Sequence, residues 1–225
     1  MSSISKLAVS SALVCCVISS HATADPVQNI IFNEDFARAN NNSLGGGWFE
    51  IEESRNDVRL QAGAIRLRDN AEGGIDAGIA RQFTASDLSG MSLSFDWKPL
   101  LASDAGDRFL VSWAESYSTR ARDWSSLFST SLGANDRAWT TSIIEPNQLA
   151  VLNGLDSFYL LFWTNLSSKA QGSEDNEGVW LDNITLTGLP TQNTPPAEVP
   201  LPSTLLLLAS GLLGLVSRKK VTFSA

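Results

Sequence analysis

Histidine and cysteine are almost absent from this sequence. Its one histidine, His21, and its two cysteines, Cys15 and Cys16, all lie within the first 24 of its 225 residues. The rest of the chain therefore cannot form a disulfide, a Ser/His/Asp triad, a Cys/His pair or a zinc site with thiolate or imidazole ligands. A folded domain beyond residue 24 must be stabilised by its hydrophobic core or by a hard cation with oxygen ligands.

Positive charge is also scarce. The chain has 16 Lys and Arg against 24 Asp and Glu, and four of the basic residues lie near its ends: Lys6, Arg218, Lys219 and Lys220. The part between them carries the other 12 basic residues and all 24 acidic ones, a net charge of about −12. Nucleic acids and anionic membrane surfaces are bound by clustered Lys and Arg. This balance argues against a nucleic-acid partner and is compatible with divalent cations.

Residues 1–24 have the layout of a secretory signal peptide. Lys6 supplies the positive start, residues 7–18 form a short apolar stretch, and Ala22-Thr23-Ala24 is a small-residue cleavage site. A stretch of about a dozen apolar residues is short for a transmembrane helix, which needs roughly 20. We expect cleavage before Asp25 and export of the rest of the chain.

The C-terminal end has three parts. Residues 189–199 form a linker with three prolines and no apolar period, residues 204–216 are apolar, and Arg218-Lys219-Lys220 is a basic cluster followed by residues 221–225. The apolar run predicts a short transmembrane helix whose basic flank stays cytoplasmic. Residues 25–199 should then lie outside the inner membrane.

The segment around Pro200-Leu201-Pro202-Ser203, with the apolar run and basic cluster that follow, resembles the PEP-CTERM class of sorting tails. That family usually has Glu where this chain has Leu201, so the tail resembles its Val-Pro-Leu-Pro variant. The resemblance implies processing of residues 200–220 by an exosortase, after transient anchoring in the inner membrane. It also implies a final place at the cell surface or in an extracellular matrix, because such tails resemble those of bacteria that secrete exopolysaccharide and form biofilms. An ordinary C-terminal anchor is the alternative.

Residues 25–188 show the period-2 alternation of strands and almost no helical spacing. Residues 123–138 are the least readable, with a short helical turn or a long loop expected over 124–132. The pattern predicts an all-β, antiparallel, jelly-roll-like β-sandwich. The expected strands are 29–32, 48–52, 58–61, 64–68, 77–83, 91–98, 108–116, 139–144, 157–163 and 179–187.

Three segments resemble parts of jelly-roll carbohydrate-binding modules. They are Phe-Asn-Glu-Asp-Phe at 32–36, Leu-Ser-Phe-Asp-Trp at 93–97, and the closing Gly-Val-Trp-Leu-Asp-Asn-Ile-Thr-Leu-Thr-Gly at 178–188. The last is the most specific, because such modules often close with an aromatic-aliphatic-Asp-Asn-aliphatic strand. The resemblance implies that the first and last strands are neighbours.

A carboxylate is predicted among apolar side chains in the closing strand. Strict alternation puts Asp182 on one face with Trp180, Ile184 and Leu186, and it puts Ile30, Phe32, Glu34 and Phe36 on one face of the first strand. A charge there needs a partner or a cation. Related carbohydrate-binding modules hold a structural Ca²⁺ where these strands meet, so the resemblance implies Ca²⁺ on Asp182 with Glu34 or Asp35 and backbone carbonyls. The alternative is that Asp182 caps a turn or accepts backbone amides.

All seven tryptophans lie beyond the signal peptide. Sugar-binding sandwiches stack pyranose faces on exposed aromatic rings flanked by polar side chains. We expect Trp124 to be such a ring, because it follows Arg122 and Asp123 in a polar loop. Trp97, Trp113 and Trp163 alternate with residues of opposite character and are expected in the core.

Three classes of function stay open: a module that binds extracellular polysaccharide, a structural component of the matrix or envelope, and a glycan hydrolase or lyase. Glycosidases need only two carboxylates. The candidate pairs are 52–53, Asp104 with Asp107, and 174–177. The last is more readily explained as a solvated acidic loop, and carboxylates that are neighbours in sequence do not set the separation that the mechanism requires. We therefore expect a non-enzymatic protein and cannot separate the first two classes by sequence.

Overall fold

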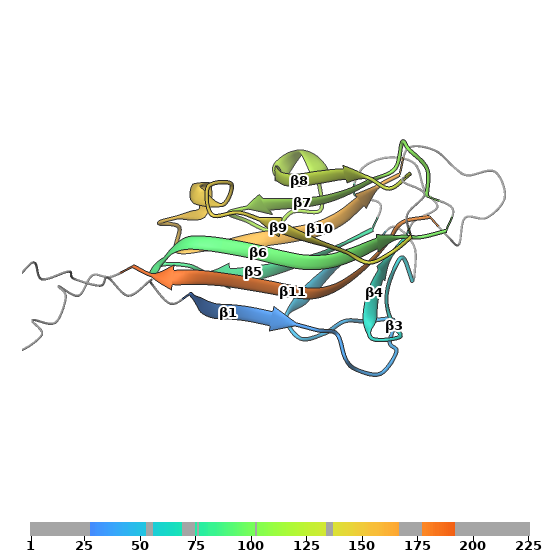
Figure 1. Cartoon of the computed structure of the whole chain (residues 1–225), viewed down its shortest axis with the longest axis horizontal. Coiled ribbons are helices and arrows are strands. Elements are labelled where there is room, and N and C mark those ends of the chain that lie inside the picture. The colour runs from blue at the N-terminus through green and yellow to red at the C-terminus, as the bar shows by residue number, and fades with distance from the viewer. Residues whose placement is uncertain are drawn as a thin grey trace, which may run out of the picture.

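The computed structural model describes residues 28–52, 56–68, 75, 77–101, 103–133, 137–166 and 177–191. Two antiparallel sheets pack face to face (Figure 1), which confirms the predicted all-β sandwich. The signal peptide, residues 192–199 of the linker and the sorting tail with its predicted transmembrane helix lie outside the described residues. In the described ranges, no helix is long and apolar enough to cross a membrane.

The first sheet has β11 (Val179–Pro190) near its centre. Its order is β3-β4-β11-β6-β9, and β1 pairs with β11 beyond the end of β4. The first and last strands are therefore neighbours (Figure 1), as the resemblance implied. The other strands of this sheet are β1 (Asn29–Glu34), β3 (Val58–Gln61), β4 (Ala64–Leu67), β6 (Leu88–Pro99) and β9 (Thr140–Ile144).

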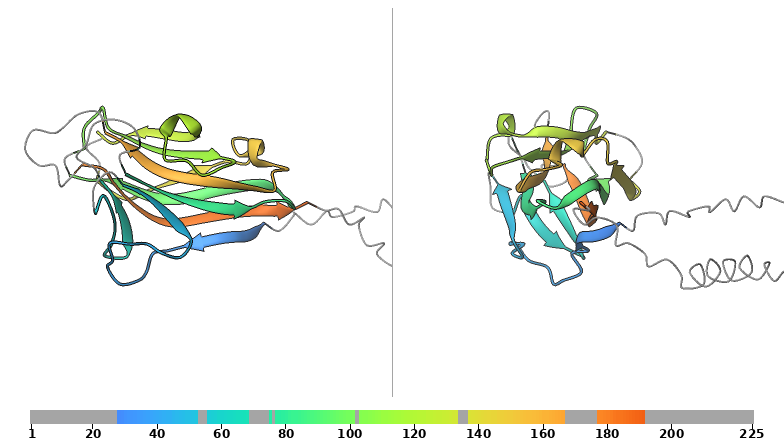
Figure 2. Two further views of the ribbon diagram at one scale, coloured as in Figure 1. Left: turned by 180° about the vertical axis from the view of Figure 1, so that it is seen from behind. Right: turned by 90° about the vertical axis from the view of Figure 1, so that its left-hand side faces the viewer.

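The second sheet has the order β2-β5-β10-β7-β8 and lies against the first (Figure 2). Its strands are β2 (Trp48–Glu52), β5 (Ala77–Thr84), β7 (Arg108–Ala114), β8 (Ser125–Ser131) and β10 (Ser157–Asn165). Two short 3₁₀ helices complete the structure: η1 (Ala121–Asp123) lies between β7 and β8, and η2 (Ala150–Leu152) lies between β9 of the first sheet and β10 of the second.

The main core fills the space between the sheets with interlocking aromatic rings. Phe95 of the first sheet meets Phe109, Phe128 and Phe162 of the second, edge to face, at 5.4–5.8 Å between ring centres. Edge-to-face contact is a favoured geometry for aromatic pairs.

A smaller cluster covers the outer side of the second sheet. In β10, Leu160 and Phe162 face the main core, whereas Leu161 and Trp163 are buried on the opposite side. The central strand of the second sheet is therefore covered on both faces.

All ten predicted strands form, and the structure adds β8, which the sequence analysis left as a turn or a loop. The reason is its composition. Ser-Ser-Leu-Phe-Ser-Thr-Ser has little apolar alternation, and β8 lies at the edge of its sheet with most of its side chains exposed or half-buried. The expected helical turn occurs earlier, as η1.

Strict alternation fails in both strands of the predicted calcium site. The pairing of β11 with β6 shifts between Asp182 and Thr185, where Asn183 has a φ of 50°. This bulge shifts the alternation by one residue, so that odd-numbered side chains point into the core before it and even-numbered ones after it. Ile184 and Leu186 are buried in the core, whereas Trp180 and Asp182 face outward, so the predicted common face is wrong.

The first strand has its own irregularity, between Ile30 and Phe32. Ile30 is 70% exposed, so it does not share the inner face with Phe32, which packs on the main core. Phe36 is buried as expected, although its backbone has left the strand and has a φ of 49°.

Candidate functional site

Trp124 is buried, contrary to the prediction that it is an exposed stacking ring. Its exposed fraction is 8%, and it packs in the cluster on the outer side of the second sheet. Its Nε1 donates a hydrogen bond to the carbonyl of Ser118 at 3.0 Å. Trp124 therefore holds residues 115–123 against the sheet. Of the three tryptophans expected in the core, Trp97 and Trp163 are buried and Trp113 is half-buried.

Three other aromatic rings form a group on the outer face of the second sheet: Phe49 of β2, Tyr159 of β10 and Tyr117 of the loop after β7. We name them the aromatic cluster. The ring centres of Phe49 and Tyr117 are 4.9 Å apart, and each lies about 6 Å from Tyr159. Phe49 is 43% and Tyr117 37% exposed, so the rings reach solvent. Partial burial raises the pKa of Tyr117.

Hollows flank the loop that carries Tyr117. One, of about 710 Å³, is lined by Glu50 and Glu52 of β2 and by Arg120 and Arg122 of the loop. The other, of about 410 Å³, is lined by residues that include Tyr117, Trp113 and Asp123. Arg122 lines the larger hollow and Asp123 the smaller one, on the segment that Trp124 anchors.

The two carboxylates of the larger hollow already accept hydrogen bonds from the protein. Glu50 accepts hydrogen bonds from the Leu44 amide and the Ser43 hydroxyl, and Glu52 accepts one from the Val58 amide at 2.8 Å. Burial is the main cause that raises the pKa of Glu52. Both carboxylates thus serve local structure.

The arginines of that hollow have fewer interactions with the protein than the carboxylates have. Arg122 has one exposed contact with Asp123, at 3.9 Å, and such surface pairs contribute little. The side chains of Arg120 and Arg122 can therefore donate to a ligand.

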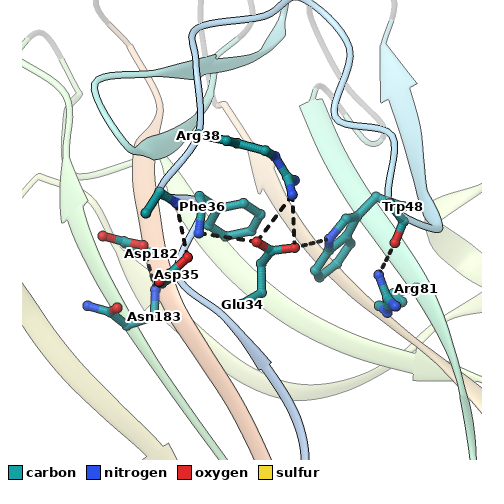
Figure 3. Close-up of polar contacts among 10 residues, drawn as sticks. Glu34, Asp35, Phe36, Arg38, Trp48, Arg81, Asp182 and Asn183 are labelled. Atoms are coloured by element: carbon teal, nitrogen blue, oxygen red, sulfur yellow. Dashed lines mark hydrogen bonds and ion pairs between the residues drawn. The ribbon is translucent and has the colours of Figure 1, made fainter.

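The predicted calcium ligands separate into two groups (Figure 3). Asp35 and Asp182 lie near each other, where the end of β1 meets the bulge of β11. The Glu34 carboxylate is directed elsewhere and accepts hydrogen bonds from the Phe36 amide, the Arg38 guanidinium and Trp48 Nε1, at 3.2–3.4 Å. Asp35 accepts the Ala37 amide and Asp182 the Asn183 amide.

Asp182 is in an unfavourable place for an anion. Burial raises its pKa, the hydrogen bond from the Asn183 amide lowers it, and the charges of Asp96, Asp35 and Glu34 raise it further. A hard cation with oxygen ligands would relieve this repulsion. Within the described ranges, however, no three acidic, histidine or cysteine side chains gather to form a metal site. The donors therefore fit Ca²⁺ in type, and backbone carbonyls and water would have to complete the ligand set.

Residues 198–220 match the PEP-CTERM protein-sorting motif. This confirms the resemblance of the tail, and it indicates an exported protein that is sorted through the membrane. No curated protein matches the sequence.

Solved structures with a similar fold have low identity to this chain. The K3 cleaved adhesin domain of Lys-gingipain from Porphyromonas gingivalis is 13% identical, with a TM-score of 0.47, over 70% of this chain and 98% of that one. A family 27 carbohydrate-binding module that recognises mannan is 12% identical, with a TM-score of 0.45, over 72% and 98%. A family 22 xylan-binding domain from Paenibacillus barcinonensis is 11% identical, with a TM-score of 0.43, over 74% and 99%. Likenesses of this size concern the general fold and say nothing about the ligand of this chain.

Phe49, Tyr117 and Tyr159 were not predicted from the sequence, because the prediction of an exposed ring rested on tryptophan in a polar loop. A usable signal was present. Phe49 alternates with Trp48 in one predicted strand, and Tyr159 lies between Phe158 and Leu160 in another, so one ring of each pair has to face away from the core.

Proposed function

We propose that this chain is an exported protein that binds an extracellular polysaccharide through the outer face of its second sheet. The observation that carries the proposal is the aromatic cluster, which combines partly exposed rings with hollows on either side of its loop. Flat rings gain apolar contact with pyranose faces at low entropic cost, since few torsions are fixed. The arginines of the larger hollow would then donate to sugar hydroxyls.

Binding without catalysis is the reading that this hollow favours. A glycosidase needs one carboxyl group that can give a proton and a second that acts as base or nucleophile. Glu50 and Glu52 are the carboxylates that line the hollow, and both accept backbone amides instead. If no polysaccharide binds, the alternative is that the protein is a structural component of the matrix.

Single-ring variants test the binding proposal. We expect Tyr117→Ala and Phe49→Ala each to weaken binding about fivefold or more, because a stacked ring contributes about 1 kcal/mol beyond its buried area. Affinity gel electrophoresis through a panel of soluble neutral polysaccharides measures this. Ile143→Ala, an exposed apolar change on the other sheet, is the matched control and should bind like wild type. Wild-type mobility that no polysaccharide alters would reject the proposal.

We also propose that a structural Ca²⁺ lies between Asp35 and Asp182. Millimolar Ca²⁺ should then raise the melting temperature, by mass action, by an amount equivalent to about 2.7 kcal/mol at 100 times the dissociation constant. Asp182→Asn should lose this increment. Glu34→Gln should keep it, because the Glu34 carboxylate is held by Arg38 and Trp48. Equal melting temperatures of the wild type in chelator and in Ca²⁺ would exclude the site.

The pH dependence of stability is a second test of the environment of Asp182. The raised pKa means that folded Asp182 holds its proton more tightly than the unfolded chain does. In chelator, stability should therefore fall as the pH rises from the ordinary aspartate pKa through the raised value. Asp182→Asn should remove that fall.

We further propose that an exosortase processes the tail and releases the protein to the cell surface or the extracellular matrix. Residues 189–225 fused to an exported reporter should be shortened near Pro200–Ser203 in a host with a matching exosortase, and a Pro200→Ala/Pro202→Ala pair should block this. Immunoblots of membrane and medium fractions measure the outcome. A full-length wild-type fusion that stays in the inner membrane of that host would refute it.

A further inference from the structure

A row of cationic and aromatic side chains crosses the outer face of the first sheet. Strand pairing puts Arg59 opposite Arg66, Arg66 opposite Trp180, and Trp180 opposite Lys98. Trp139, just before β9, continues the line, since its ring centre is 4.7 Å from the Lys98 Nζ. Residues directly opposite in antiparallel pairs project from one face. We name these five residues the cation–indole row.

The row faces away from the core. Trp180 lies between Val179 and Leu181, which are both buried, and so its own side chain projects outward. At the usual spacing between strands of about 4.8 Å, five residues on adjacent strands span about 19 Å. The row is therefore long enough for an extended polymer and lies on the opposite side of the sandwich from the aromatic cluster.

Two cations of the row, Lys98 and Arg59, are poorly compensated. The Lys98 ammonium lies over the rings of both Trp139 and Trp180 and makes no ion pair with a described carboxylate. The buried Nε of Arg59 has no hydrogen-bond partner among the described residues. A bound anion would give both of these groups a partner.

A recess beside the row is large enough to hold an anionic group. It has a volume of about 320 Å³, and its lining includes Arg66, Lys98, Arg137 and Trp180. Arg137 is tied to the rim by a hydrogen bond from its Nη2 to the Leu101 carbonyl at 2.7 Å. Three cations and an indole thus converge on one hollow in a chain whose net charge is −8.

We propose that the cation–indole row is a second glycan site, specific for a polysaccharide of uronic acids. Arginine matches a carboxylate with two parallel hydrogen bonds, and an indole offers a flat face to a sugar ring. Every unit of a uronate polymer has a carboxylate and a sugar ring. These two groups complement the cations and the indoles of the row.

The test compares polygalacturonate with its fully methyl-esterified form, which keeps the rings and loses the charges. In affinity electrophoresis at low salt, the purified chain should be retarded by the acid form and not by the ester. Retardation should weaken as salt is added. The double variant Arg66→Gln/Lys98→Gln should lose about tenfold or more in affinity for the acid form. Arg108→Gln, an exposed arginine of the second sheet, is the matched control and should bind normally.

The two sites are separable in the same assay. Tyr117→Ala should keep its affinity for polygalacturonate and bind neutral polysaccharide more weakly, and the double variant should do the reverse. If the double variant fails to fold, Trp139→Ala replaces it, because that ring is 44% exposed and its loss should weaken binding to the acid form alone. Equal retardation by acid and ester, unchanged affinity in the row variants, or tighter binding to polyphosphate or anionic lipid vesicles would overturn the proposal.

Discussion

Gly178→Ala is expected to destabilise the fold by more than about 4 kcal/mol and to leave little folded protein. A Cβ at this position would lie 2.0 Å from the carbonyl oxygen of Leu67 and 2.9 Å from the Cα of Arg68. Both are backbone atoms at the end of β4, so relief would require β4 to move off β11. The φ of Gly178 is 125°, which an alanine rarely adopts.

The hydrogen bonds around Gly178 would be lost together. Its carbonyl accepts from the Leu100 amide at 2.9 Å and the Ser103 hydroxyl at 3.0 Å, and its amide donates to that hydroxyl at 2.9 Å. Gly63→Ala is the matched control. Gly63 also has a positive φ, 75°, but a Cβ there would meet no atom within 4 Å. It should cost only about 1–2 kcal/mol for the left-handed backbone. Urea unfolding measures both variants, and equal losses would contradict the steric account.

Trp124→Ala is expected to destabilise the fold by about 3–5 kcal/mol, as for other large-to-small changes in a core. The ring packs with Ile51 and Trp163 on the outer side of the second sheet, and its loss would leave a cavity there. Polysaccharide binding should fall as well, since residues 115–123 carry Tyr117 and the arginines of the larger hollow.

The conservative variant separates packing from hydrogen bonding. Trp124→Phe keeps most of the apolar contact and loses the bond to the Ser118 carbonyl, so it should cost about 0.5–1.5 kcal/mol for that bond. Trp139→Ala removes an exposed ring and should change stability by no more than about 0.5 kcal/mol. Denaturant midpoints measure all three. Loss of binding in Trp124→Ala with unchanged stability would restore the exposed-ring hypothesis.

The strands could be predicted because their alternation is strong. Val58, Leu60, Ile65 and Leu67 all face the core, and the residues between them are more exposed, as a half-buried sheet requires. The adjacency of the first and last strands followed from a resemblance and is confirmed. β8 could not be predicted, because a serine-rich edge strand is held mainly by backbone pairing with β7.

The site residues were harder to predict, because one irregular residue in a strand changes the side of the sheet to which all the following side chains point. The bulge at Asn183 turns Asp182 outward, and nothing in the alternation of Leu, Asp, Ile and Leu marks its position. Trp124 was misjudged because its polar neighbours Arg122 and Asp123 suggested exposure. In a loop folded back over a sheet, a single large ring can be buried while the residues before it reach solvent.

The position of a bound oligosaccharide tests the central claim most directly. Crystals of the chain soaked with an oligosaccharide of the best-binding neutral polysaccharide should show sugar rings against Phe49, Tyr117 and Tyr159, with hydroxyls near Arg120 or Arg122. Sugar bound elsewhere, with the aromatic cluster uncovered, would contradict the account.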